Sequence, residues 1–540
     1  MKTLISLLVV VLSSSALAQV CSADQLNRDL QTLRRLSLDL KGRGPTRAEY
    51  DAAVLRGGLA GDELDAMLVS PEFKTVMRER VKADVYGALD LDWQNGFSLE
   101  LTGAVPFGDS RDVFWNRFRT VRSLFSSCDV TREQTQFTPD GVPVPAADGR
   151  EGWVWVAPYW APQTRIKVCA YDAQAHLRGP QTNTDCSTGG GPQAIDCGCG
   201  PNLSFCQLTV GYATNKGVPN GPVEIFEATE ATLDRAFAEQ MLRFTDRIID
   251  TQRPWSDLLL SDETEVNGPI AHYLRWQTGT TAYANLSSRP NLGYVVPSTL
   301  EWTQKDNWVR VRSTGKAAGL LTQPAWLLKF ATNRARANRF YNAFLCSVFQ
   351  APPGGLPSST EPCAQEPNLA RRCGCDSCHQ TLEPMAAYWG RFAERGTHEL
   401  LTPEFPTDDP TCVAPSGSNV NTQRCQTFYV TRARIPAEQP WVGKLKAYAY
   451  ADDFNGNIDD GPLTLARNAV NTGDFARCTV TKEFERLVGR PFNSQLADER
   501  ALQDSLTTEF IASNHDLRRL LRRILESRQY RSNDSAGGVP

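Results

Sequence analysis

The sequence predicts a mainly α-helical protein of several domains, interrupted by one disulfide-rich insertion of strands and loops. Apolar residues recur at three- and four-residue intervals in the first, middle and last parts of the chain, as helices require. Residues 128–222 replace that pattern with Gly, Pro, Asn, Thr and Cys. A length of 540 residues corresponds to about three or four domains.

The chain begins with a segment typical of a secretory signal. Met1 and Lys2 form a short basic start, an apolar run follows, and Ala16-Leu17-Ala18 is a small-residue cleavage site. We therefore expect residues 1–18 to be removed and the mature protein to be exported to the periplasm, the cell surface or the medium. No later run is long and apolar enough to predict a transmembrane segment. Fifteen cysteines suit an oxidising compartment.

Residues 19–127 are predicted to form an N-terminal helical domain. Thr46 and Glu49 have the spacing of a capping box at a helix start. Ser70 followed by Pro71 is typical of a second helix start, because the ring of proline suits the first helical position.

Residues 128–222 are predicted to form the strand-and-loop insertion. The alternating segment WVWV, Trp153–Val156, indicates a strand, and five cysteines between Cys169 and Cys206 indicate disulfides of undetermined connectivity. Aromatic residues also gather here, and packing within the insertion is favoured over a binding surface. These aromatic residues are Trp153, Trp155, Tyr159 and Trp160.

Residues 223–350 are predicted to form a second helical domain. An apolar stripe that includes Met241 runs along Ala231–Asp250, and helical patterns cover 256–276 and 323–350. The Arg-Pro pair after the stripe ends the first of these helices.

Residues 351–460 contain a cysteine cluster in a loop-rich region, and residues 461–540 are predicted to form a C-terminal helical module. Cys412 and Cys425 are expected to close one of the loops. An apolar stripe within 517–525 predicts the final long helix.

The segment Cys375-Asp376-Ser377-Cys378-His379 matches the C-x-x-C-H pattern of covalent haem attachment. Two thiols three residues apart lie on one side of a helical turn, where each can form a thioether with one vinyl group of the same porphyrin. The histidine that follows is then the proximal iron ligand. The sequence therefore predicts one haem c, held by Cys375, Cys378 and His379.

Two other interpretations of this cluster remain. The cysteines can form ordinary disulfides, with His379 as a surface residue. Alternatively, Cys373, Cys375, Cys378 and His379 can bind zinc, although two adjacent residues have difficulty reaching one tetrahedral ion. If haem is bound, Cys373 needs a different partner, such as Cys363 or Cys478.

The second axial ligand is less defined by the sequence. His272, Met241 and His398 are the candidates, and each of the first two has an ordinary role in a helix as an alternative. A vacant position is a further possibility, and it changes the expected function from carrying electrons to activating a small molecule.

Other signals are weaker. DDFNGNIDD, Asp452–Asp460, is rich in oxygen ligands, but its spacing does not match the calcium-binding EF-hand loop, so a turn is favoured. The formal charge of −4 gives no basic excess, and nucleic acid is not an expected partner.

Four segments, in order along the chain, resemble the secreted cytochrome c-like proteins of planctomycetes and myxobacteria, a family without an assigned substrate. The similar segments are Leu33–Asp51, Ala318–Cys346, Cys375–Phe392 and Phe475–Phe492. The family usually has an Asp-Pro pair after the haem motif, where this chain has Glu383-Pro384, and the insertion has no counterpart. The resemblance implies a helical, cytochrome c-like haem region in an extracytoplasmic protein.

We therefore expect an exported monohaem c-type cytochrome that transfers single electrons to or from a redox partner protein or a small-molecule donor or acceptor. Tyr388, Trp389 and Phe392 are the nearest candidates for packing on the haem. One alternative is a haem peroxidase or oxygenase with an open distal site. Another is an extracellular binding or structural protein in which haem is auxiliary.

Overall fold

The structure is a computed structural model. It describes residues 25–87, 114–115, 128–157, 165–186, 196–203, 223–276, 294–297, 299–300, 304–349, 358, 360–394, 397, 399–402, 405–414 and 423–532. Helices dominate this part of the chain, which confirms the prediction of a mainly α-helical protein with few strands. The expected signal segment, 1–18, lies outside the described residues.

The N-terminal part forms consecutive helices, as predicted. They are residues 25–41, α2 (Arg47–Arg56), α3 (Glu63–Leu68) and α4 (Pro71–Val81), followed by a π-helical turn, Lys82–Tyr86. The Thr46 hydroxyl accepts a hydrogen bond from the Glu49 N–H at 3.2 Å, and the Glu49 carboxylate accepts one from the Thr46 N–H at 2.6 Å. This confirms the capping box, and Ser70 caps α4 with Pro71 at its first position.

The described part of the insertion contains a small sheet with the strand order β1-β4-β3-β2. Its strands are β1 (Phe114–Trp115), β2 (Cys128–Glu133), β3 (Glu151–Val156) and β4 (Ile166–Cys169). The predicted WVWV strand is β3, which pairs antiparallel with β4, with Trp153 opposite Cys169. A disulfide joins Cys186 to Cys197 in the loops that follow. Tyr159 and Trp160 lie outside the described residues, so their predicted packing stays a prediction.

The described middle of the chain is helical except for one antiparallel pair of strands. The elements are α5 (Val223–Asp250), α6 (Asp257–Leu260), β5 (Glu263–Val266), α7 (Gly268–Trp276), β6 (Val309–Arg312), α8 (Pro324–Lys329) and α9 (Asn333–Phe344). The prediction of helix over 256–276 was wrong for β5, which pairs antiparallel with β6. Alternate residues of β5 are buried, so the strand is stabilised by a partner more than forty residues away.

The C-terminal part is helical after a loop-rich stretch, as predicted. Its helices are α10 (Asp376–Ala387), α11 (Gln423–Phe428), α12 (Asn455–Asn471), α13 (Asp474–Val488), α14 (Ala497–Ala512), α15 (Leu517–Leu525) and α16 (Arg528–Ser532). The turn predicted for Asp452–Asp460 was wrong. The segment forms a short 3-10 helix, Asp452–Phe454, and the start of α12, because Ile458 is fully buried in the core beneath it.

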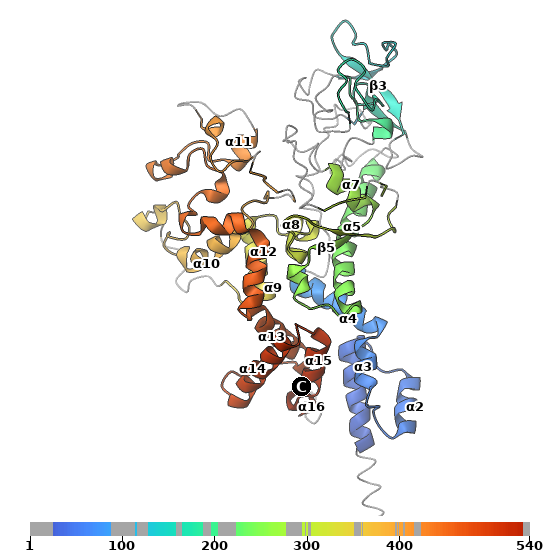
Figure 1. The fold of residues 1–540 in the computed structure, drawn as a ribbon, viewed down its shortest axis with the longest axis vertical. Coiled ribbons are helices and arrows are strands. Elements are labelled where there is room, and N and C mark those ends of the chain that lie inside the picture. The colour runs from blue at the N-terminus through green and yellow to red at the C-terminus, as the bar shows by residue number, and fades with distance from the viewer. Residues whose placement is uncertain are drawn as a thin grey trace, which may run out of the picture.

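Figure 1 shows α10, α11 and α12 on one side of the molecule and α5 with the strands of the insertion on the other. A large apolar core joins helices from the N-terminal, middle and C-terminal parts of the chain.

Two further links connect distant segments. Cys346, just after α9, forms a disulfide with Cys478 in α13, and Arg80 in α4 forms an ion pair with Glu483 in α13.

Among the residues that the structure describes, none of the helices combines the length and the apolar character that crossing a bilayer requires.

The side chains of Arg80 and Glu483 are only 9% and 6% exposed. The contribution of this buried ion pair to stability can therefore be tested by mutation. Glu483→Gln removes the carboxylate that pairs with both the buried Arg80 and Arg486, so the free energy of unfolding should fall by about 3–5 kcal/mol in urea denaturation. The double variant Arg80→Met/Glu483→Leu should recover most of this loss. Arg477→Gln, which breaks the exposed pair between Arg477 in α13 and Asp504 in α14, is the control and should cost less than about 1 kcal/mol.

Candidate functional site

The C-x-x-C-H motif lies at the start of α10. Cys375 is the residue that precedes the helix, and Cys378 and His379 belong to its first turn. The backbone N–H groups of Cys378 and His379 both donate to the Cys375 carbonyl, at 3.2 and 3.0 Å. The structure therefore places the two sulfur-bearing residues and the imidazole on one helical turn, as their spacing predicts.

The loop before the motif is fixed by a disulfide between Cys363 and Cys373. Cys363 is one of the two partners expected for Cys373. Gly374 follows with φ +75°, a left-handed conformation that lets the chain turn between Cys373 and Cys375. Because Cys373 is oxidised, it cannot supply the fourth ligand of the zinc site considered above.

Cys375 and Cys378 differ in redox state from the cysteines around them. Ten cysteines in the described part of the chain are disulfide-bonded, including Cys412 and Cys425, which close one loop as predicted. Cys375 and Cys378 are thiols, and each is half-buried. The structure therefore differs from the interpretation in which these two cysteines form ordinary disulfides.

His379 is oriented by a carboxylate four residues later on the same helix. Its Nδ1 lies 2.5 Å from Glu383 Oε1, and the two side chains are 21% and 17% exposed. Arg334, in the first turn of α9, holds the same carboxylate through two hydrogen bonds, from Nε at 2.7 Å and from a terminal nitrogen at 3.2 Å. With Nδ1 engaged by Glu383, Nε2 is the ring nitrogen left for a metal ion.

The segment that follows α10 anchors the C-terminal end of this helix in the core. The indole of Trp389 is fully buried and donates to the Leu321 carbonyl at 3.2 Å. The fully buried guanidinium of Arg336 in α9 donates to the carbonyls of Leu327 and Ala393, both at 2.9 Å. The helix that carries the motif therefore has one end in the core and the other at the surface.

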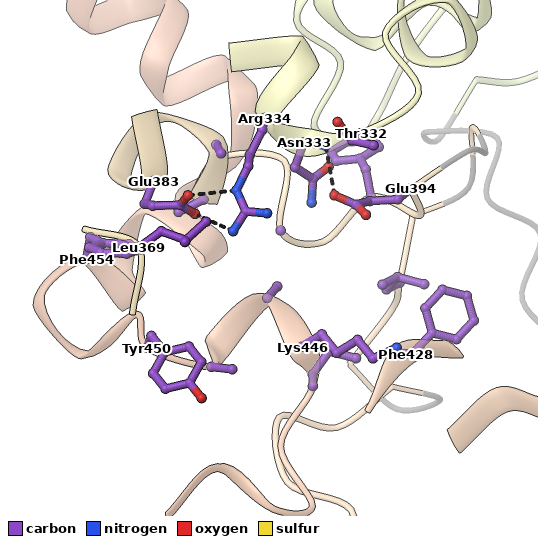
Figure 2. A pocket seen from close by; sticks show the side chains of 18 of the residues that line it. Thr332, Asn333, Arg334, Leu369, Glu383, Glu394, Phe428, Lys446, Tyr450 and Phe454 are labelled. Atoms are coloured by element: carbon purple, nitrogen blue, oxygen red, sulfur yellow. Dashed lines mark hydrogen bonds and ion pairs between the residues drawn. The ribbon is translucent and has the colours of Figure 1, made fainter. Parts of the chain in front are cut away.

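A cavity of about 710 Å³ lies beside α10. Figure 2 shows the Arg334–Glu383 pair and Glu394 on one side of it, with Lys446 and Tyr450 opposite. Its apolar lining comes from α10, the segment after it, α11, the loop near 445 and the 3-10 helix before α12, and includes Ala386, Ala387, Gly390, Phe392, Leu400, Phe428, Leu445 and Phe454. The volume is within the range of about 300–1,000 Å³ that ligand sites occupy.

The polar groups that line this cavity are mostly engaged with the protein. Glu394 accepts a hydrogen bond from the Asn333 N–H at 3.0 Å, and the Lys446 ammonium donates to the carbonyls of Gln426 and Thr427 at 2.8 and 2.6 Å. Burial lowers the pKa of Lys446 below its usual value. Burial also raises the pKa of Tyr450 to about 12.

The structure does not bring Met241 to the motif. Met241 is fully buried in the apolar core on α5, which Figure 1 shows well apart from α10. His272 belongs to α7, but the structure does not describe its side chain, and His398 lies outside the described residues. The identity of a second axial ligand stays a prediction.

The aromatic residues expected to pack on the haem have different positions. Phe392 lines the cavity beside α10. Trp389 instead packs in the core, where its ring stacks on that of Trp326 at a centroid distance of 6.5 Å. Tyr388 is half-buried against the same core.

Sequence reasoning did not identify Glu383 and Arg334 as site residues. The spacing of four residues from His379 to Glu383 is a signal that predicts contact on a helix. Arg334 gives no such signal, because α9 and α10 meet only through their tertiary packing.

Comparisons of the chain with protein-family models, with curated proteins and with solved structures give no match.

The redox state of the motif predicts a difference in thiol content. We expect the unreduced chain, exported without haem, to have two more reactive thiols than its Cys375→Ser/Cys378→Ser variant, because both cysteines are thiols in the structure. Titration with a thiol reagent in denaturant, without reductant, measures the difference. Equal thiol counts in the two proteins would show that the motif closes a disulfide of its own.

Proposed function

We propose that this chain is an exported monohaem c-type cytochrome that transfers single electrons. The observation that carries the proposal is the pair of thiols, Cys375 and Cys378, on one helical turn with His379, in a chain whose other described cysteines include ten in disulfides. A chain that oxidises ten cysteines and leaves these two reduced is consistent with their use in a covalent attachment.

The residues present fit a haem c. Cys375 and Cys378 would supply the two thioether sulfurs, and His379 would supply Nε2 as the proximal ligand, because Glu383 engages Nδ1. Bound haem supplies reversible one-electron chemistry at its iron. The protein's own contribution is to fix the imidazole and to limit the access of water with the apolar side chains around α10.

Export is part of the same proposal. Disulfides form and persist in oxidising compartments, and those of this chain include one that spans the motif, Cys346–Cys478. We infer that the protein acts in the periplasm, at the cell surface or in the medium. Its partner would be a redox protein or a small-molecule electron donor or acceptor.

Covalent haem is the measurable consequence of the proposal. Mature protein from a host that attaches haem c should give a pyridine haemochrome spectrum with one haem per chain, and the haem should survive denaturation. Cys375→Ser/Cys378→Ser should abolish covalent attachment, because no thioether can form.

The matched control is Cys363→Ser/Cys373→Ser, which removes the neighbouring disulfide and should keep the haem. A colourless wild-type protein that is folded and exported would contradict the proposal.

The cavity beside α10 favours a second candidate, a haem enzyme that acts on a small molecule. A cavity of about 710 Å³ with both apolar and polar lining residues is a feature that electron transfer alone does not require, although Cys375, Cys378 and His379 do not line it. Absorption spectra distinguish the two functions. A six-coordinate low-spin ferric form supports the carrier, and a high-spin form that binds cyanide or reacts with peroxide supports the enzyme.

A further inference from the structure

We propose that Glu383 is a positioning residue that fixes the orientation of His379 and lowers the reduction potential of the site, and that Arg334 holds it in place. The inference rests on the proposed function and specifies how the protein controls the iron ligand. Two contacts support it. Arg334 in α9 bonds to Glu383 in α10, and Glu383 bonds to His379 on the same helix.

The first contact selects one form of the imidazole. Glu383 Oε1 lies 2.5 Å from His379 Nδ1, so Nδ1 carries the proton and donates it to the carboxylate. The two residues are four apart on α10, and the helix itself keeps them together. The ring is therefore fixed in the tautomer that presents Nε2 before any ligand arrives.

The second contact fixes the carboxylate from another helix. Arg334 binds both oxygens of Glu383 with a forked geometry, at 2.7 and 3.2 Å. Figure 2 shows the guanidinium lying against the Glu383 carboxylate at the edge of the cavity. Arg334 is 52% exposed, so the pair contributes little to stability by itself. Its role here is to prevent Glu383 from turning away from His379.

The chemical consequence concerns electron donation by the histidine. A carboxylate that accepts the Nδ1 proton makes the imidazole a more basic ligand than a backbone carbonyl would. A more basic ligand stabilises the ferric state relative to the ferrous state, and the reduction potential falls. Glu383 therefore shifts the site toward donating electrons.

The test compares Glu383→Gln with the wild-type protein, both loaded with haem. The variant should keep one covalent haem per chain, because the cysteines and His379 are intact. Its reduction potential, measured by spectroelectrochemistry, should be higher than that of the wild type, because the neutral amide is a weaker acceptor. Glu394→Gln is the matched control, since Glu394 lines the same cavity but bonds to Asn333, and its potential should be unchanged.

A second measurement uses the wild-type protein and does not depend on how a variant folds. The chain has only five histidines, so labelling with 15N-histidine allows the Nδ1 proton of His379 to be assigned in the ferrous state. A hydrogen bond to a carboxylate should move this proton downfield of its position in Glu383→Gln and of a histidine bonded to a backbone carbonyl. A wild-type shift equal to that of a carbonyl-bonded histidine would overturn the inference.

The role of Arg334 is tested by Arg334→Gln, alone and combined with Glu383→Gln. If Arg334 acts through Glu383, the change in potential of the double variant differs from the sum of the two single changes, and additive changes would overturn its role. Unchanged potential and proton shift in Glu383→Gln, with haem attached, would refute the inference and leave the proposed function intact. A wild-type chain without haem would refute both.

Discussion

The packing of α9 against α10 is the constraint on which the candidate site depends. Arg336 in α9 lies within the core, where its fully buried guanidinium bonds to the carbonyls of Leu327 in α8 and of Ala393 in the segment after α10. A buried cation of this kind persists only where the surrounding carbonyls satisfy its donors. Near the surface, Arg334 repeats the connection through the Glu383 carboxylate. The orientation of the His379 imidazole therefore depends on the packing of α9 against α10, although the motif itself is half-buried.

The cysteines near the start of α10 fall into two groups. Cys363 and Cys373 form a disulfide, whereas Cys375 and Cys378 are thiols. Cys363–Cys373 fixes the loop immediately before the motif, and a single left-handed glycine lies between that disulfide and Cys375. Because Cys373 is already bonded to Cys363, it cannot form a disulfide with Cys375. Cys375 and Cys378 then lie on the first turn of α10 as two thiols.

The sequence predicted the elements whose signals are local. The capping box at Thr46, the helix start at Ser70 and the loop closed by Cys412 and Cys425 all follow from neighbouring residues, and the structure contains them. It did not predict β5, because the strand is stabilised by its pairing with β6. It also did not predict the contact of Arg334 with Glu383, because that contact requires the packing of α9 against α10. The helix at Asn455 was missed for the same reason, since the burial of Ile458 outweighs the turn-forming residues around it. For the site, the pattern indicated Cys375, Cys378 and His379, whereas the residues that orient them are determined by tertiary structure.

The disulfide between Cys346 and Cys478 closes a covalent ring of the backbone that contains the whole motif, its loop and α10 to α12. A protease that cuts the chain once inside this ring would not release a fragment, because both new ends stay tethered through the two sulfur atoms. In an environment rich in hydrolases, the nicked molecule would migrate as a single species on a gel without reductant and separate into two pieces only when reductant is added. The region proposed to carry the cofactor is therefore protected against loss by a single cleavage.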